Sequence, residues 1–346
     1  MARIVVTGTS ARAVGNWLPA FDHLVRLGHR VETILFPNLS DPDHLGLDAL
    51  SLPRLADFPI PQSLRRIDWE TVSNLAAAAH DVLARDVVAG VVLTTCHAGP
   101  EKALAERLFR ASQRPVIIGC QHGTVQRWSA YWDNFTFDEF LVFGEAFRES
   151  APDALRSRVH ATGLPKLDVI VAPPRPPFTL DGRPILFAAQ TTRTDEIICR
   201  LHALALVSGR EVRVRPHPEF PGLFADSGFK VMAPGQPLLE QMAECSLVIT
   251  SGSTTVLEAL VAGCPCVVLP LEHGDAYTAA GIVATAGAPE EILAIAARQQ
   301  QQPGRQITAD FLARTVGTFG SRATERAAML IATLVQARTS QCGEAG

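Results

Sequence analysis

Short apolar runs alternate along this chain with segments in which apolar residues recur every three or four positions. The period of three or four predicts helices, and the short runs predict buried strands. In the first half the predicted strands are residues 3–7, 30–36, 87–94, 115–119, 140–143 and 159–161. Helices are predicted at residues 17–28, 68–85 and 100–112, with small-residue and proline-rich loops at 8–16 and 37–67. Strands that alternate with helices predict an α/β fold with parallel, doubly wound sheets.

The alternation stops at a run of prolines and then starts again. Residues 173–177 read Pro-Pro-Arg-Pro-Pro, which fits neither a helix nor a central strand. Beyond it, strands are predicted at residues 185–188, 211–215, 247–249 and 266–269, with helices between them. We therefore expect an N-terminal domain at 1–172, a hinge at 173–177 and a C-terminal domain at 178–320. A final helix and tail at 321–346 would cross back onto the first domain. The length of 346 residues suits two domains.

Composition narrows the classes of function. The formal net charge is −4 and no basic block occurs, which argues against a nucleic-acid partner. No apolar run approaches the length of a membrane-spanning helix. The seven cysteines lack metal-ligand spacing, so we expect no metal site and a reducing, cytoplasmic setting. The first predicted strand begins almost at the initiator Met, which leaves no room for a signal peptide.

The most informative segment follows the apolar run 247–249. It is a turn of small and hydroxyl residues, Ser251, Gly252, Ser253, Thr254 and Thr255, followed by a segment of helical period. Backbone N–H groups at such a helix start bind phosphate well. Glu258 lies one turn further on, where its carboxylate could accept hydrogen bonds from ribose hydroxyls. The alternative interpretation is that the hydroxyls only cap the helix.

Further candidates follow other predicted strands, where ligands of doubly wound sheets bind. His122, between Gln121 and Thr124, could take a proton from a hydroxyl group, or only hydrogen-bond its own loop. Arg215 and His217 could bind a phosphate, or belong to a surface turn. Contacts to a sugar or an acceptor are expected from Gln121 and Thr124 themselves, and from Ser10 and Asp275.

These segments resemble motifs of the GT-B glycosyltransferases, in which two Rossmann-like domains face each other across a cleft. Residues 251–265 resemble the donor motif of the transferase that adds GlcNAc to lipid I. That resemblance implies that Ser251 to Thr255 hold diphosphate and that Glu258 holds the ribose. The segments at 121–124, 163–168 and 215–218 resemble CDP-glycerol glycerophosphotransferases and related capsule-polymer transferases. This second resemblance implies that His122 is the base and that His217 contacts nucleotide phosphate.

The chain also departs from those families. Val125, Gln126 and Arg127 follow His-Gly-Thr where the glycerophosphotransferases favour Pro and Lys, and the Ser251 turn lacks their acidic and aromatic residues. The donor therefore stays open between UDP-, CMP- and CDP-linked compounds.

The expected function is a metal-independent, inverting transfer of a sugar to a hydroxyl acceptor, as in the synthesis of cell-surface polysaccharide or glycolipid. No cofactor is expected, since the nucleotide-sugar is a substrate. A glycerophosphoryl-type transfer is the variant of this mechanism. The alternatives are an enzyme like the UDP-GlcNAc 2-epimerases and a non-catalytic subunit that binds nucleotide-sugar. Exposed apolar residues around Trp17 or in the 37–67 loop would place the protein peripherally on the inner face of a membrane.

Overall fold

The computed structural model divides the chain into two compact units. Unit 1 comprises Met1–Ile170 and Ala313–Gly346, and unit 2 comprises Val171–Leu312. The prolines at 173–177 lie outside the residues that the structure describes. Those residues are 1–37, 51–60, 68–94, 99–111, 114–123, 132, 135–168, 182–189, 195–217, 222–233, 236, 238–251, 255–269, 287–301, 305–317 and 322–343.

The sheet of unit 1 is parallel throughout, in the order β3-β2-β1-β4-β5-β6-β7. Its strands are β1 (Arg3–Gly8), β2 (Arg30–Leu35), β3 (Arg54–Asp57), β4 (Gly90–Leu93), β5 (Val116–Cys120), β6 (Glu139–Val142) and β7 (Val159–Ala161). The central strands β4 and β5 are buried at every residue, as expected where helices cover both faces. The edge strand β3 lies within a segment for which the sequence predicts only loop. Its four residues are too few, and too exposed, for an apolar pattern to reveal them.

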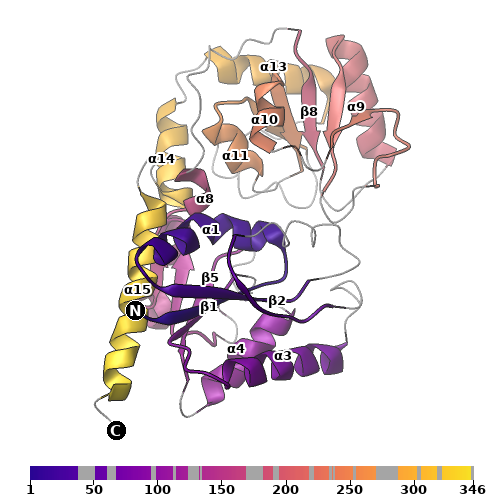
Figure 1. Cartoon of the computed structure of the whole chain (residues 1–346). Helices are drawn as coiled ribbons and strands as arrows, with labels where there is room; N and C mark the ends of the chain where they lie inside the picture. Colours follow the sequence, from indigo (N-terminus) through magenta and orange to yellow (C-terminus); the bar gives the residue numbers. More distant parts are fainter. Residues whose placement is uncertain are drawn as a thin grey trace. The chain divides into compact units, whose positions relative to one another are not determined.

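Helices cover both faces of this sheet (Figure 1). Together α3 (Trp69–Leu83) and α4 (Gly99–Arg110) pack on one face. On the other face α1 (Ala11–Arg26) packs against α8 (Pro165–Asp168) and α15 (Ala323–Gly343). Two short helices, α6 (Glu145–Glu149) and α7 (Asp153–Arg156), precede β7.

Helix α1 begins at residue 11, although the sequence predicts a loop as far as residue 16. The N-cap is Ser10, whose side chain accepts a hydrogen bond from the Ala13 N–H at 3.2 Å. A Cβ on Gly8 would lie 2.2 Å from Cγ2 of Val14, so only glycine lets this first turn approach the end of β1. The small residues therefore let a helix pack closely on a strand. Because they show no apolar period, the sequence pattern does not reveal the start of this helix.

The C-terminal part of the chain returns to unit 1, and helix α14 (Arg305–Val316) spans the second boundary between the units. Gly163 has a φ of +91°, and a Cβ there would meet Cβ of Ala323 at 2.5 Å. The Arg326 guanidinium donates to the Thr162 carbonyl, and the Asp168 carboxylate accepts from the Thr324 N–H at 2.7 Å. The last helix thus packs against the segment Thr162–Asp168 and is hydrogen-bonded to it.

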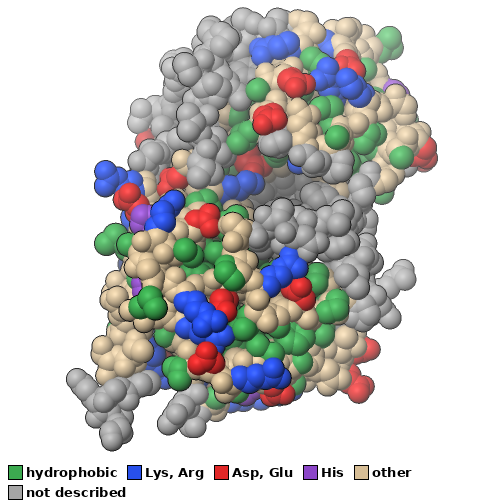
Figure 2. Space-filling view, viewed as in Figure 1, with side chains coloured by type: hydrophobic (Ala, Val, Ile, Leu, Met, Phe, Trp, Pro, Cys, Tyr) green, Lys and Arg blue, Asp and Glu red, His purple; other side chains and the backbone are tan. Residues whose placement is uncertain are grey.

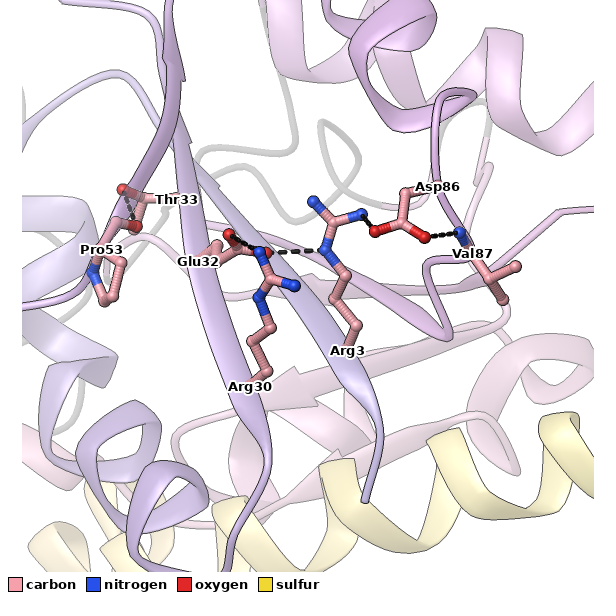
Figure 3. Close-up of polar contacts among 7 residues, drawn as sticks. All are labelled: Arg3, Arg30, Glu32, Thr33, Pro53, Asp86 and Val87. Atoms are coloured by element: carbon pink, nitrogen blue, oxygen red, sulfur yellow. Dashed lines mark hydrogen bonds and ion pairs between the residues drawn. The ribbon is translucent and has the colours of Figure 1, made fainter.

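Ion pairs join the amino ends of the strands in unit 1 (Figure 3). The Glu32 carboxylate accepts from Arg3 at 2.7 Å and from Arg30 at 2.8 Å, and Arg3 also pairs with Asp86. Burial tends to raise the pKa of Glu32, but the hydrogen bonds and charges of the two arginines outweigh it and lower that pKa. These groups therefore hold the edge of the sheet opposite to the strands' carboxyl ends.

Unit 2 has a second parallel sheet, in the order β10-β9-β8-β11-β12. Its strands are β8 (Ile185–Ala188), β9 (Val212–Arg215), β10 (Lys230–Val231), β11 (Leu247–Thr250) and β12 (Cys266–Val268). The helices α9 (Asp195–Ser208) and α13 (Pro289–Gln301) pack together over one apolar face. The helices α10 (Leu238–Ala243) and α11 (Thr255–Val261) also contact each other. The strands predicted at 185–188, 211–215, 247–249 and 266–269 are confirmed, and their bounds agree to within one residue at each end.

The sequence predicts exposed apolar residues around Trp17 that would contact a membrane, and the structure does not bear this out. Trp17, proposed as part of an exposed apolar site, is fully buried and packs on Phe143 with ring centroids 5.6 Å apart, so that expectation is wrong for this residue. The loop at 37–67 lies largely outside the described residues. Among the described helices, none combines the length and hydropathy required to cross a bilayer. On the face drawn in Figure 2, acidic and basic side chains are interspersed.

Candidate functional site

Each sheet has one place where its strand order reverses, and there neighbouring strands continue into loops that diverge. In unit 1 this place lies between β1 and β4, and in unit 2 it lies between β8 and β11. Ligands of doubly wound sheets bind at the carboxyl ends of strands at such a point. The two candidate sites are therefore the carboxyl ends of β1 and β4 in unit 1 and those of β8 and β11 in unit 2. We refer to each as the edge of its unit, and the two differ in the charged side chains found there.

The last rung of the unit 2 sheet brings a cation to the edge. Arg215 is opposite Ala188, Ala188 is opposite Thr250, and Thr250 is opposite Val268. Residues opposite each other in register share a face of the sheet. The small Ala188 therefore lies beside Arg215 on the side toward β11.

The Arg215 side chain is partly buried, and its guanidinium donates a hydrogen bond to the Gln236 carbonyl at 2.7 Å. Burial lowers its pKa, and the negative charge of Glu258 opposes that effect. No carboxylate pairs with Arg215 within 4.0 Å among the residues that the structure describes. Arg213, two residues earlier on the same face, pairs with Glu211 at 2.7 Å and with Glu244 at 2.9 Å. Among the described residues, Arg215 is thus a partly buried cation with a backbone acceptor and no carboxylate within ion-pair distance.

Other predicted residues of unit 2 lie near that edge. Ser251 directly follows β11, Thr255 begins α11, and Glu258 is in the first turn of α11. Their side chains are at most 9% exposed, and His217, two residues beyond β9, is 6% exposed. The electrostatic effect of Glu258 on Arg215 shows that the structure brings these two residues together. Gly252, Ser253 and Thr254 lie outside the described residues, as does Asp275. Helix α11 has only seven residues, so the fixed charge of Arg215 matters more here than the helix dipole.

The corresponding place in unit 1 already holds an acidic side chain of the chain itself. Glu101, in the first turn of α4, is fully buried. Its Oε1 accepts a hydrogen bond from the hydroxyl of Thr7 at the end of β1 and another from the Thr94 N–H, at 2.9 Å, just after β4. The Glu101 carboxyl group therefore bridges the carboxyl ends of β1 and β4.

His122 lies in unit 1, two residues beyond the end of β5, and its ring is half-buried. Its carbonyl accepts from Asn16 Nδ2 at 2.9 Å, and the Gln121 carbonyl accepts from Trp17 Nε1 at 3.0 Å. The Gln121 side chain donates to the Gly123 carbonyl and accepts from the Phe143 N–H, both at 2.9 Å. Because it is 1% exposed and bound to backbone at both ends, Gln121 supports the turn in this structure. Ser10 caps α1, and Thr124 lies outside the described residues.

Sequence reasoning missed Glu101, Asn16 and Gln236. Asn16 directly precedes the predicted helix 17–28 and Glu101 lies in the first turn of the predicted helix 100–112, so a polar residue at a predicted helix start is a usable signal. Gln236 contributes only its carbonyl, so no side-chain pattern could identify it. Where the chain is described, no three or more His, Cys, Asp or Glu residues gather in a way that could hold a metal ion.

Comparisons with known proteins define the fold. No protein-family model matches the chain, and no curated protein matches it in sequence. The UDP-GlcNAc 2-epimerase of Neisseria meningitidis, solved with UDP-GlcNAc bound, is 14% identical and has a TM-score of 0.62, with 96% of this chain and 100% of that one covered. The UDP-GlcNAc 2-epimerase of Methanocaldococcus jannaschii, in complex with UDP-GlcNAc and UDP, is 11% identical and has a TM-score of 0.66. That match covers 97% of this chain and 100% of the epimerase.

A glycosyltransferase matches over a similar extent. CalG4, the calicheamicin glycosyltransferase, is 15% identical with a TM-score of 0.59, and the match covers 97% of this chain and 98% of that one. At these identities the similarity establishes the fold, which is that of the GT-B class with two Rossmann-like domains.

Proposed function

We propose that the chain is a nucleotide-sugar enzyme and, more narrowly, a glycosyltransferase that moves a sugar from a nucleotide donor to a hydroxyl acceptor. The observation that carries the proposal is Arg215. A partly desolvated guanidinium with no ion-pair partner among the described residues is costly unless an anion binds to it, and Arg215 lies at the carboxyl ends of the strands, where such folds bind ligands. The GT-B neighbours with UDP or UDP-GlcNAc bound support a nucleotide as the source of that anion.

The residues of unit 2 suit the leaving group of the transfer. Arg215 would bind the phosphate by charge-assisted hydrogen bonds, and His217 would donate a further one. The hydroxyls of Ser251 and Thr255 would bind phosphate oxygens, and Glu258 would accept from the ribose. As the bond between sugar and phosphate breaks, the charge that develops on the phosphate is stabilised by groups already in place.

In unit 1, His122 would be the general base. Its imidazole would take the proton of the acceptor hydroxyl while the oxygen forms a bond to the anomeric carbon of the sugar. Such an attack inverts the configuration at that carbon, and the nucleotide leaves with the electron pair of the broken bond. The donor's base stays open between uracil and cytosine, as do the sugar and the acceptor.

A UDP-GlcNAc 2-epimerase is the second candidate, because epimerases stand beside glycosyltransferases among the structural neighbours. Incubation with UDP-GlcNAc alone separates the two. An epimerase interconverts the sugar without an acceptor, whereas a transferase gives at most slow release of UDP. Epimer formation would overturn the proposed transfer.

Calorimetric titration with CMP, CDP, UDP and GDP tests the nucleotide site. We expect saturable binding of at least one pyrimidine nucleotide, and the absence of binding would contradict the proposal. With a sugar donor of the nucleotide that binds, and a hydroxyl acceptor found by screening, His122→Ala should abolish turnover and leave nucleotide affinity within about twofold, since His122 lies in the other unit. Undiminished turnover in His122→Ala would remove it as the base. Binding of the nucleotide without any turnover would favour a non-catalytic subunit.

A further inference from the structure

His122 is held by a group of side chains for which the proposed reaction has no direct use. Asn16 and Trp17 belong to the second turn of α1, Gln121 precedes the histidine, and Phe143 follows β6. We call these four residues the His122 clamp. All of them are at most 6% exposed, so they cannot be surface groups in accidental contact.

The hydrogen bonds of the clamp form a continuous series around the turn. Two carbonyls, those of Gln121 and His122, accept from Trp17 Nε1 at 3.0 Å and from Asn16 Nδ2 at 2.9 Å. The Gln121 amide connects the Gly123 carbonyl to the Phe143 N–H, at 2.9 Å each. Three consecutive carbonyls are therefore fixed by side chains from two separate parts of unit 1.

The aromatic members close the arrangement. The ring of Trp17 packs on that of Phe143 with centroids 5.6 Å apart, so the residue that donates to Gln121 O also packs on the residue that donates to Gln121 Oε1. Nδ1 of His122 is buried, which leaves Nε2 as the nitrogen that can reach an acceptor. A side chain with one buried nitrogen keeps its orientation only as long as its backbone stays in place.

We infer that Asn16 and Trp17 are positioning residues for His122, fixing the peptide that carries it so that the ring presents one nitrogen to the acceptor hydroxyl. This inference rests on the proposed function, in which His122 takes the acceptor proton. An enzyme gains from such a clamp because a misplacement of about 1 Å can cost as much as 100-fold in rate.

The test uses the full-length protein labelled with ¹³C at the histidine ring. The chain has ten histidines, and the His122 cross peak is the one lost in His122→Gln. Trp17→Phe removes the indole N–H but keeps a ring against Phe143, and Asn16→Ala removes the other donor. Each should displace or split the His122 peak. Peaks that superimpose on the wild-type peak in both variants would overturn the inference.

Asp138→Asn is the matched control. Asp138 accepts from the Ile117 N–H at 2.8 Å and binds Arg114, so it supports β5 near its amino end. Its replacement should lower stability and leave the His122 peak in place. A peak that moves equally in Asp138→Asn would mean that general loosening of the strand, rather than the clamp, determines the ring's position, and would also overturn the inference.

A kinetic measurement separates this inference from the proposed function. With the sugar donor that the enzyme uses, the kcat of Trp17→Phe and of Asn16→Ala should fall about 10- to 100-fold, while KM stays within about twofold of the wild-type value. Full kcat in both variants, with His122→Gln inactive, would overturn the positioning role alone. If His122→Gln keeps full turnover while Trp17→Phe displaces the peak, the proposed function fails and the structural role of the clamp stands.

Discussion

The two strand edges at the reversals of the two sheets have the same topology and opposite electrostatics. In unit 1, the Glu101 carboxyl group accepts from the Thr7 hydroxyl and the Thr94 N–H and so bridges the two strand ends. In unit 2, Arg215 provides a guanidinium that is supported only by a backbone carbonyl and lacks an ion-pair partner within the described residues. The comparison teaches that this topology creates a place for an anion, and that the sequence decides whether the chain or a ligand supplies it.

The same contrast recurs within one strand of unit 2. Arg213 and Arg215 lie on the same face of β9, but of the two only Arg213 is paired with carboxylates that the structure describes. The hydrogen bond that Arg213 donates to Glu211 raises the pKa of Arg213, whereas burial lowers the pKa of Arg215. One arginine thus stabilises the fold, and the other is retained at a cost that a bound phosphate would offset.

The largest effect is expected when the internal anion of unit 1 is removed. Glu101→Ala leaves the Thr7 hydroxyl and the Thr94 N–H buried without this acceptor, which should lower the free energy of unfolding by about 3 kcal/mol. Glu101→Gln keeps a carbonyl oxygen and should lose about half as much. Denaturant unfolding monitored in unit 1 measures both. An Ala variant as stable as the wild type would show that the edge does not need its own anion.

Removing the cation of unit 2 should act on binding. Arg215→Met should weaken nucleotide affinity about 10- to 100-fold, because charge-assisted hydrogen bonds are lost. Arg213→Met is the matched control on the same strand and should change the affinity less than about twofold. Isothermal titration calorimetry gives both values, and equal losses in the two variants would refute the distinction between the two arginines.

Acid should weaken unit 1 through its paired carboxylates. Burial tends to raise the pKa of Asp138, but hydrogen bonds from Arg114 and from the Ile117 N–H, with the nearby positive charges, outweigh it and lower that pKa. A carboxyl group with a lowered pKa in the folded state adds stability above its unfolded value of about 3.9, and that stability disappears as pH falls through the folded value.

The measurement compares Asp138→Asn with the wild type from pH 7 downward. The variant should be less stable by about 1 kcal/mol at pH 7, and the difference should shrink below about pH 4. A difference that does not change with pH would show that the carboxylate's charge is not what stabilises this part of unit 1.

The smallest expected effect concerns stability without ligand. Arg215→Met exchanges a desolvated charge for an apolar side chain, so the free energy of unfolding should stay constant or rise by about 0.5 kcal/mol. Arg213→Met loses two partly exposed ion pairs, so its free energy of unfolding should fall by about 0.5 kcal/mol. Thermal unfolding without nucleotide gives the sign of each change. A clear loss of stability in Arg215→Met would mean that this guanidinium serves the fold.

Much of the fold and of the edge in unit 2 was predictable because its signals are local. The Val-Arg-Val-Arg pattern predicts a strand that ends in Arg215, and the small residues after β11 predict a turn before a helix. Parallel strands then bring these two segments to one edge. What the pattern could not give is the difference between Arg213 and Arg215, since Glu244, a partner of Arg213, lies 31 positions further along the chain.

Unit 1 shows the limits more clearly. The early start of α1 depends on the contact between Gly8 and Val14, a packing fact that hydrophobic period does not encode. Trp17 was expected at the surface, because the sequence does not show which face of a helix a residue at its start lies on. Its burial follows from Phe143 and Gln121, which are more than 100 positions away.

The return of the last helix makes unit 2 an insertion between the two parts of unit 1. During synthesis, all five strands of unit 2 emerge before α15 does. Until then Gly90 lacks the Val335 side chain that lies against it in the finished protein. The second unit can therefore complete its sheet while the first still waits for its final helix, so the order of folding on the ribosome would be the reverse of the order of the sequence.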